Sequence, residues 1–98
     1  KPGMSMHDLD DGVTKVLEDS AYKDFIVHKT GHGLGMDVHE DPYVMRKNYE
    51  LLEKGMIITI EPGLYKDKYL GIRIEDDVLI TDKGCKSLTS FDRDIRVI

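Results

Sequence analysis

The apolar side chains near the start of the chain recur every three or four residues, at Met6, Leu9, Val13, Val16 and Leu17. Such spacing gathers them on one face of a helix, so the pattern predicts an amphipathic helix over residues 6–19. Ser5 precedes this segment and Asp8 follows three residues later, which is the pattern of a capped first turn. The first predicted element is therefore a helix whose apolar face requires a partner surface.

Further along, short apolar segments predict β-strands. They cover residues 22–27, 57–61, 71–81 and 86–88. The third segment alternates most clearly, because one face carries Ile72, Ile74, Val78 and Ile80. The opposite face carries Arg73, Glu75 and Asp77. One helix packed on a mostly antiparallel sheet is an α+β fold, and this is the fold class that we predict.

Proline, glycine and polar clusters predict the breaks between these elements. Pro62 and Gly63 should end the strand over residues 57–61, and residues 81–84 should form a turn. Asp41–Pro42 and residues 46–48 predict an exposed loop. Residues 49–54 predict a helical turn that Gly55 closes.

Composition and charge narrow the class of protein. With 98 residues, 40% of them hydrophobic and 34% charged, the chain has the composition of one soluble globular unit. Its net charge of -5 opposes binding to nucleic acid and to anionic membranes, so we expect neither as a partner. No apolar run approaches the roughly 20 residues of a membrane span. The single cysteine, Cys85, cannot close a disulfide within the chain, which favours a reducing, cytoplasmic compartment.

Three histidines stand among glycines in the middle of the chain, and two strands that each carry a glutamate follow. The histidines are His28, His32 and His39, and the glutamates are Glu61 and Glu75. A polar strand face is usually only the solvated side of a half-buried sheet, and a histidine among glycines is usually a loop residue. The coincidence of all these groups instead favours a site for metal ions, which imidazole and carboxylate groups bind.

The surroundings of the histidines restrict the kind of metal site. His28 and His32 are four residues apart, but the glycines around them disfavour a helix, so the side chains should project from a strand or loop. Lys29 follows His28, where the helical zinc peptidases carry a glutamate. No cysteine is near, which argues against structural zinc. Carboxylate-rich ligation suits a hydrolytic centre, and the spacing leaves open whether all three histidines serve one metal.

Three motifs carry a resemblance to a known family. Residues 28–40 follow the pattern His-x-x-Gly-His-Gly-x-Gly-x-x-Val-His-Glu, residues 59–63 read Thr-Ile-Glu-Pro-Gly, and residues 71–77 read Gly-Ile-Arg-Ile-Glu-Asp-Asp. In this order they resemble the C-terminal part of the pita-bread metallopeptidases, which include methionine aminopeptidase, Xaa-Pro aminopeptidase and Xaa-Pro dipeptidase (prolidase). The third motif resembles the proline-directed members. Lys29 departs from the family pattern, which has glycine there.

The resemblance implies a fold and a metal centre. The fold would be the C-terminal portion of a pita-bread fold, a curved and mostly antiparallel sheet with a packed amphipathic helix. His32, Glu61 and Glu75 would hold two divalent metal ions, with Glu75 bridging them. Manganese or cobalt would be expected, with zinc or iron as alternatives.

The resemblance also implies catalytic and substrate-binding residues. His39 would contact the scissile carbonyl, His28 would face the substrate, and Arg73 would orient the bridging acid or contact substrate. Arg46 lies in the loop between His39 and Glu61, which lines the cleft mouth in the resembled fold, and an arginine fork suits the free carboxylate of a dipeptide. The alternative for Arg46 is a solvated loop charge.

The implied activity is metal-dependent hydrolysis of the Xaa-Pro bond at the N-terminus of dipeptides or short peptides. The family's centre also takes two aspartates from an upstream strand pair, so we expect residues 1–98 to be the C-terminal part of a catalytic domain whose upstream part is absent. We expect this part to be inactive alone, and the parent protein to be a homodimer. The alternative is a catalytically silent module that binds peptides or proteins on the same fold.

Overall fold

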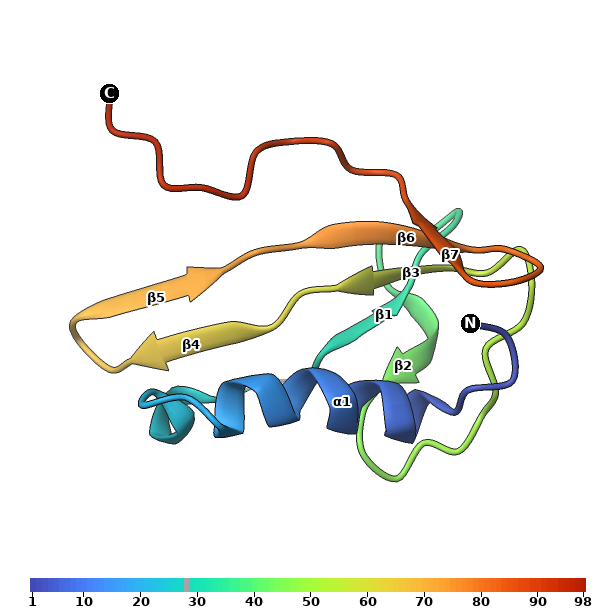
Figure 1. Ribbon diagram of the computed structural model, residues 1–98, viewed down its shortest axis with the longest axis horizontal. Coiled ribbons are helices and arrows are strands. Elements are labelled where there is room, and N and C mark those ends of the chain that lie inside the picture. The colour runs from blue at the N-terminus through green and yellow to red at the C-terminus, as the bar shows by residue number, and fades with distance from the viewer. Residues whose placement is uncertain (28) are drawn as a thin grey trace.

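The computed structural model describes residues 1–27 and 29–98 and shows one long helix lying along one side of antiparallel β-structure (Figure 1). The elements are α1 (Met6–Glu18), the 3₁₀ helix η1 (Lys23–Phe25), β1 (Gly31–Gly33), β2 (Glu40–Val44), β3 (Ile57–Ile60), β4 (Gly63–Lys66), β5 (Leu70–Arg73), β6 (Asp76–Ile80) and β7 (Cys85–Ser87). The predicted α+β class is confirmed. No helix in the described part of the chain has the length and apolar character needed to cross a membrane.

The helix forms as its sequence predicts. The Ser5 hydroxyl accepts a hydrogen bond from the Asp8 backbone N–H at 3.0 Å, which satisfies one of the free donors of the first turn. Met6 is fully buried and Leu9 packs beside it against the core. The predicted bounds of residues 6–19 are therefore confirmed to within one residue.

The sheet places the sequence motifs next to one another. Five strands pair in the order β2-β1-β3-β6-β7, and β4 pairs with β5 as a separate two-stranded ladder, all antiparallel. Figure 1 shows that β3 and β4 run beside β6 and β5 as one long hairpin. A compact core joins the helix to the sheet, made of Met6, Val44, Leu52, Ile58 and Ile80.

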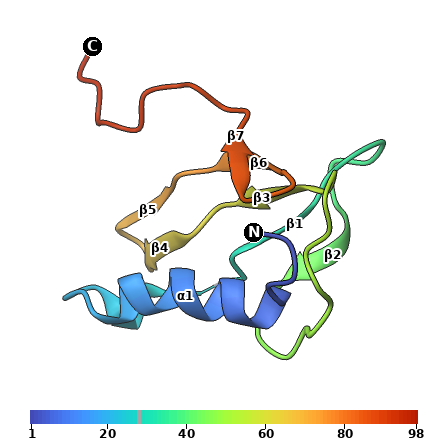
Figure 2. The same cartoon turned by 45° about the vertical axis from the view of Figure 1, so that its right-hand side comes forward.

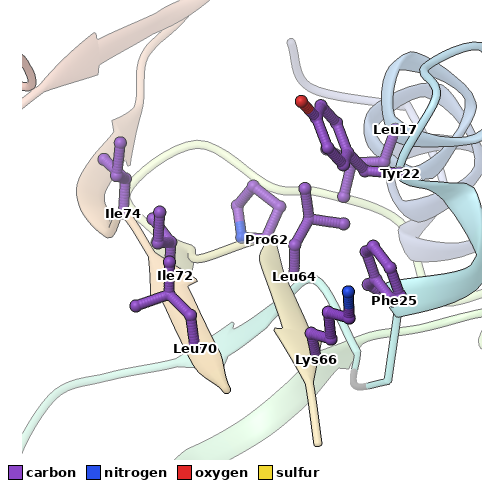
Figure 3. Close-up of a pocket in the computed structure, with 9 residues that line it drawn as sticks. All are labelled: Leu17, Tyr22, Phe25, Pro62, Leu64, Lys66, Leu70, Ile72 and Ile74. Carbon is purple, nitrogen blue, oxygen red and sulfur yellow. The ribbon is translucent and has the colours of Figure 1, made fainter.

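The hairpin has two different faces. Leu64 and Ile72 line an open apolar pocket of about 580 Å³, which Phe25 of η1 also lines (Figure 3). Pro62 lines the same pocket, and neighbouring residues on an extended chain point to opposite faces. The pocket therefore lies on the face of the hairpin opposite to the Glu61 side chain.

The predicted strand over residues 22–27 is wrong. The Tyr22 N–H donates to the Ser20 hydroxyl at 3.1 Å, and the Phe25 N–H donates to the Tyr22 carbonyl at 3.0 Å. These local bonds turn the chain into η1 and leave only Ile26 to bridge to Leu64. Aromatic and β-branched residues here pack on a neighbouring strand without joining a sheet.

Residues 46–48 form a loop as predicted, but the Asp41–Pro42 part of the loop prediction and the helical turn predicted over residues 49–54 are wrong. Asp41 and Pro42 lie within β2, which tolerates proline because it is the edge strand of the sheet. Residues 49–54 are not helical, because Leu52 is buried in the core and its N–H donates to the Met4 carbonyl at 2.8 Å. Tertiary pairing with the N-terminal segment therefore replaces the predicted helical turn.

The remaining strand predictions are largely confirmed. β3 ends before Pro62, residues 81–84 form the turn, and β7 lies within one residue of the predicted final strand. The predicted strand over residues 71–81 is divided into β5 and β6, and residues 74–75 form the break between them. This break contains Glu75.

Candidate metal centre

His32 lies at the middle of β1, between β2 and β3, and only 8% of it is exposed. The two glycines beside it allow this position. A Cβ on Gly31 would lie 1.9 Å from the Thr59 carbonyl oxygen, and one on Gly33 would lie 2.4 Å from the Asp41 carbonyl oxygen. The close backbone approach that alternating glycines indicate is thus the reason that His32 can sit inside the sheet.

His32 and Glu61 form a direct pair. The His32 Nε2 atom lies 2.8 Å from Glu61 Oε1, and His32 Nδ1 lies 2.8 Å from the Gly33 carbonyl oxygen. A carbonyl only accepts, so Nδ1 carries a hydrogen and donates to it. The Nε2 atom therefore faces the carboxylate, and the two can share a proton or a cation. A carbonyl that orients the far nitrogen of a histidine is typical of metal sites.

Thr59 connects these two residues and was not found from the sequence. Its hydroxyl donates to Glu61 Oε1 at 2.9 Å and accepts from the His32 backbone N–H at 3.1 Å. The side chain is fully enclosed, so both bonds are shielded from water. The signal was its position two residues before Glu61, because residues i and i+2 of a strand share a face.

Buried Asp10 attaches helix α1 to the same region. The Thr30 hydroxyl donates to Asp10 Oδ1 at 2.6 Å, and the Thr30 carbonyl accepts from the Glu61 N–H at 2.7 Å. Only 6% of Asp10 is exposed, so these bonds are needed to offset the burial of its carboxylate. The helix and the two segments that carry His32 and Glu61 therefore hold one another in place.

The backbone register brings Glu75 opposite Glu61. In the main sheet Ile60 pairs with Asp76, and in the hairpin Gly63 pairs with Arg73. Both ladders keep one register, so residues 61 and 75 face each other in the break between them, with side chains on the same face.

Arg73 lies between the two acids. Its Nε is 3.4 Å from Glu61 Oε2, and its Nη2 is 4.0 Å from Glu75 Oε2. The guanidinium is half exposed. It therefore approaches both carboxylates from the solvent side and partly offsets their mutual repulsion.

Of the two histidines predicted to contact substrate, His39 lies beside His32. The His39 ring centroid lies 4.4 Å from that of His32, at the end of the loop between β1 and β2. His28, predicted to face the substrate, lies outside the described residues. His39 is exposed, so it stands on the open side of the buried imidazole.

Arg46 is engaged by the helix. Its Nη2 lies 2.9 Å from Glu18 Oε1 and 3.3 Å from Asp11 Oδ1, and its Nε lies 3.9 Å from Asp10 Oδ2. The hydrogen bond to Glu18 raises the pKa of Arg46 above its ordinary value. These ion pairs join the loop after β2 to α1.

The donor set fits part of a divalent metal site. Across residues 1–27 and 29–98, no three histidine, cysteine or acidic side chains gather closely enough to hold a metal. Two ligand atoms at about 2.1 Å from one ion and roughly at right angles lie about 3 Å apart, which matches the 2.8 Å between His32 Nε2 and Glu61 Oε1. Glu75 supplies a further oxygen donor opposite them in register.

The comparisons with known proteins identify the family. The profile of metallopeptidase family M24 matches residues 1–82, so the chain belongs to this family. Over 95 residues it is 43% identical to the Xaa-Pro dipeptidase of Pyrococcus furiosus. The aligned region covers 97% of this chain and 27% of that protein. A putative dipeptidase of Bacillus subtilis is 43% identical over 98 residues. The chain thus spans about a quarter of the length of these curated relatives.

Solved structures agree with this assignment. The prolidase from Pyrococcus furiosus superposes with a TM-score of 0.91 at 44% identity, over 95% of this chain and 28% of that chain. The X-Pro aminopeptidase from Thermotoga maritima gives 0.94 at 37% identity, over 100% and 28% of the two chains. The resemblance to pita-bread metallopeptidases and the predicted fold class are therefore confirmed, and the chain covers a part of that fold.

Proposed function

We propose that residues 1–98 are the C-terminal part of a catalytic domain that hydrolyses the Xaa-Pro bond at the N-terminus of dipeptides or short peptides. The observation that carries this proposal is the buried His32–Glu61 pair with Glu75 opposite in register. The relatives named Xaa-Pro dipeptidase and prolidase support it. Below, the longer protein means a chain of the relatives' length that contains these 98 residues.

In this proposal His32, Glu61 and Glu75 hold two divalent metal ions, and two aspartates elsewhere in the longer protein complete the site. When bound, the ions supply an activated water and polarise the scissile carbonyl. Manganese or cobalt is our expected metal, and zinc and iron remain alternatives. The similar solved structure of E. coli Aminopeptidase P in complex with product is zinc-substituted, which supports zinc as one of the alternatives.

The chain's own residues divide the remaining work. Thr59 keeps the Glu61 carboxylate and the His32 backbone in fixed relation, so neither ligand has to reorganise during the reaction. Exposed His39 lies beside His32, where it can donate to the carbonyl oxygen as negative charge develops there. Arg73 holds the two carboxylates in position, and His28 is proposed to contact the substrate.

The same proposal includes the substrate, the oligomeric state and the cellular location of the longer protein. A peptide with proline in second position is the substrate, and we expect a homodimer. A cytoplasmic location is our expectation from the single cysteine, Cys85, which is exposed and unpaired with any other cysteine of these 98 residues.

The longer protein, loaded with manganese or cobalt, should release proline from Ala-Pro or alanine from Ala-Pro-Pro. Removal of the metal with a chelator should lower the rate by more than about 100-fold, because the ions generate the nucleophile, and added metal should restore it. Product release measured by chromatography checks this, with the isolated 98 residues as an inactive control. Binding of both peptides without cleavage would instead establish the silent peptide-binding module.

Arg46→Ala in the longer protein separates the two interpretations of Arg46. Because Glu18, Asp11 and Asp10 already hold the guanidinium, we expect kcat/KM to change equally, by less than about threefold, for Ala-Pro and Ala-Pro-Pro. The predicted carboxylate clamp requires a different result. It would raise KM for Ala-Pro alone and lower its kcat/KM roughly ten- to hundredfold, since only the dipeptide carries its free carboxylate on the proline in second position. Steady-state kinetics on both peptides decides.

A further inference from the structure

Asp76 is a charged residue at an apolar position. It lies on the strand face that carries Ile74 before it and Val78 after it, and Val78 packs against the core. The Asp76 side chain is 24% exposed. A carboxylate at such a position loses hydration and needs strong hydrogen-bond donors in return. The regular alternation of residues 72–80 would otherwise place an apolar side chain here.

Its donors come from the segment that follows β7. Arg93 makes a two-pronged contact, with Nε at 2.8 Å from Asp76 Oδ2 and Nη2 at 2.8 Å from Oδ1. The Thr89 hydroxyl donates to Oδ1 at 2.6 Å. The hydrogen bonds from Arg93, and then that from Thr89, lower the pKa of Asp76 below its ordinary value. We call this set of Asp76, Thr89 and Arg93 the clasp.

The clasp joins the segment after β7 to the first residue of β6, directly after Glu75. Figure 2 shows that the segment after β7 leaves the sheet and runs to the C-terminus on the side of β6, away from helix α1. The Leu88 N–H donates to the Asp77 carbonyl at 2.7 Å, which begins this path. Asp76 is the first residue of β6, and Glu75 precedes it in the break where neither ladder continues. Glu75 therefore depends on its neighbours for its position.

The clasp differs from an ordinary surface ion pair in the number and geometry of its hydrogen bonds. Single exposed pairs are weak because water screens them and both side chains lose freedom. Here two parallel bonds from a planar guanidinium and one from a hydroxyl converge on one carboxylate, which sets its orientation as well as its charge. The backbone of the residue next to Glu75 is thus held from the face opposite to the metal centre.

We propose that the clasp positions the Glu75 carboxylate beside Glu61, which makes Arg93 a positioning residue for metal binding. The inference rests on the proposed function for the role of Glu75 as a ligand. It assigns a task to the C-terminal segment, which contributes no ligand itself. Loss of the clasp lets the break between β5 and β6 fluctuate, so that the two carboxylates meet an ion in the required geometry for less of the time.

The test compares Arg93→Ala, Arg93→Lys and Arg96→Ala in the longer protein. Arg96 is the matched control, because it lies on the same segment and no hydrogen bond or ion pair holds it among the described residues. Arg93→Ala should raise hydrogen exchange at the amides of residues 74–78 and weaken manganese binding by about tenfold in calorimetry, in the range typical for residues that support ligands. Arg93→Lys should restore part of both, because it keeps the charge and loses the fork. Arg96→Ala should match the unaltered protein.

A second control separates positioning from general stability. Ile80→Val removes a methylene from the core at the far end of β6 and should lower the melting temperature without changing manganese affinity. If Arg93→Ala binds manganese as tightly as the unaltered protein, the clasp only anchors the tail and the inference is overturned. Failure of the unaltered protein to bind manganese, cobalt, zinc or iron would sink the proposed function. In that case hydrogen exchange alone would test whether the clasp holds the break between β5 and β6. Unchanged exchange at residues 74–78 in Arg93→Ala would overturn the inference.

Discussion

His32→Ala in the longer protein should abolish peptidase activity and weaken manganese binding by more than about 100-fold. Changes to residues that merely support ligands cost about 10- to 100-fold in affinity, and His32 is proposed as a ligand itself. In the unaltered protein the Glu61 carboxylate lies 2.8 Å from His32 Nε2, so removal of the imidazole also leaves this carboxylate without a partner on that side. Isothermal titration calorimetry with manganese and an assay on Ala-Pro measure the two effects.

His7→Ala provides the matched control for this substitution. The His7 ring packs against that of Tyr49 in a tilted arrangement with centroids 5.0 Å apart, and its Nδ1 accepts a hydrogen bond from the Lys47 backbone N–H at 3.1 Å. Among the described residues, no hydrogen bond, ion pair or ring contact joins His7 to His32, Glu61 or Glu75, so metal affinity should remain unchanged. Retention of tight manganese binding and activity in His32→Ala would remove His32 from the ligand set and, with it, the observation on which the proposed function depends.

Gly31→Ala should be among the most damaging single substitutions for folding. The added Cβ would lie 1.9 Å from the Thr59 carbonyl oxygen and 2.7 Å from its carbonyl carbon. Backbone atoms of a central strand cannot move aside as a flexible side chain can, so β1 and β3 would have to separate. We expect a loss of about 3 kcal/mol in the free energy of unfolding, at the upper end for overpacked cores. Thermal and denaturant unfolding of the longer protein measure it.

Gly12→Ala tests the same substitution where space is open. Gly12 lies inside α1, and a Cβ there meets no atom within 4 Å. Alanine should therefore stabilise the helix by roughly 0.5–1 kcal/mol, because it reduces the freedom of the unfolded chain. If the two variants unfolded at the same temperature, the tight contact between β1 and β3 would be refuted. Separation of β1 from β3 should also loosen the Thr59 bonds to His32 and Glu61, so Gly31→Ala should lose metal binding as well.

The sequence predicted those elements whose structure is decided by neighbouring residues. The helical spacing of Met6 and Leu9 and the cap at Ser5 determine α1, because a helix satisfies its backbone within itself. The turn at residues 81–84 and the stop at Pro62 are similarly local. The error at residues 49–54 has the opposite cause, because pairing with the distant N-terminal segment selects one of the conformations that their own pattern permits. The error at residues 22–27 is local, because hydrogen bonds to Ser20 and Tyr22 turn a segment of strand-like composition into η1.

The candidate site divides in the same way. The sequence by itself determined which chemical groups are present and in which order, and this was enough to predict a family that is confirmed. The resemblance to that family in turn implied His32, Glu61 and Glu75 as ligand candidates. Only the tertiary structure showed that His32 and Glu61 touch, that Thr59 joins them and that Arg73 approaches both acids. It also showed that Arg46 is held by α1 and that Arg93 reaches Asp76. The physical reason is that these contacts depend on strand register and on where the chain returns, and both are set by burial of the whole core.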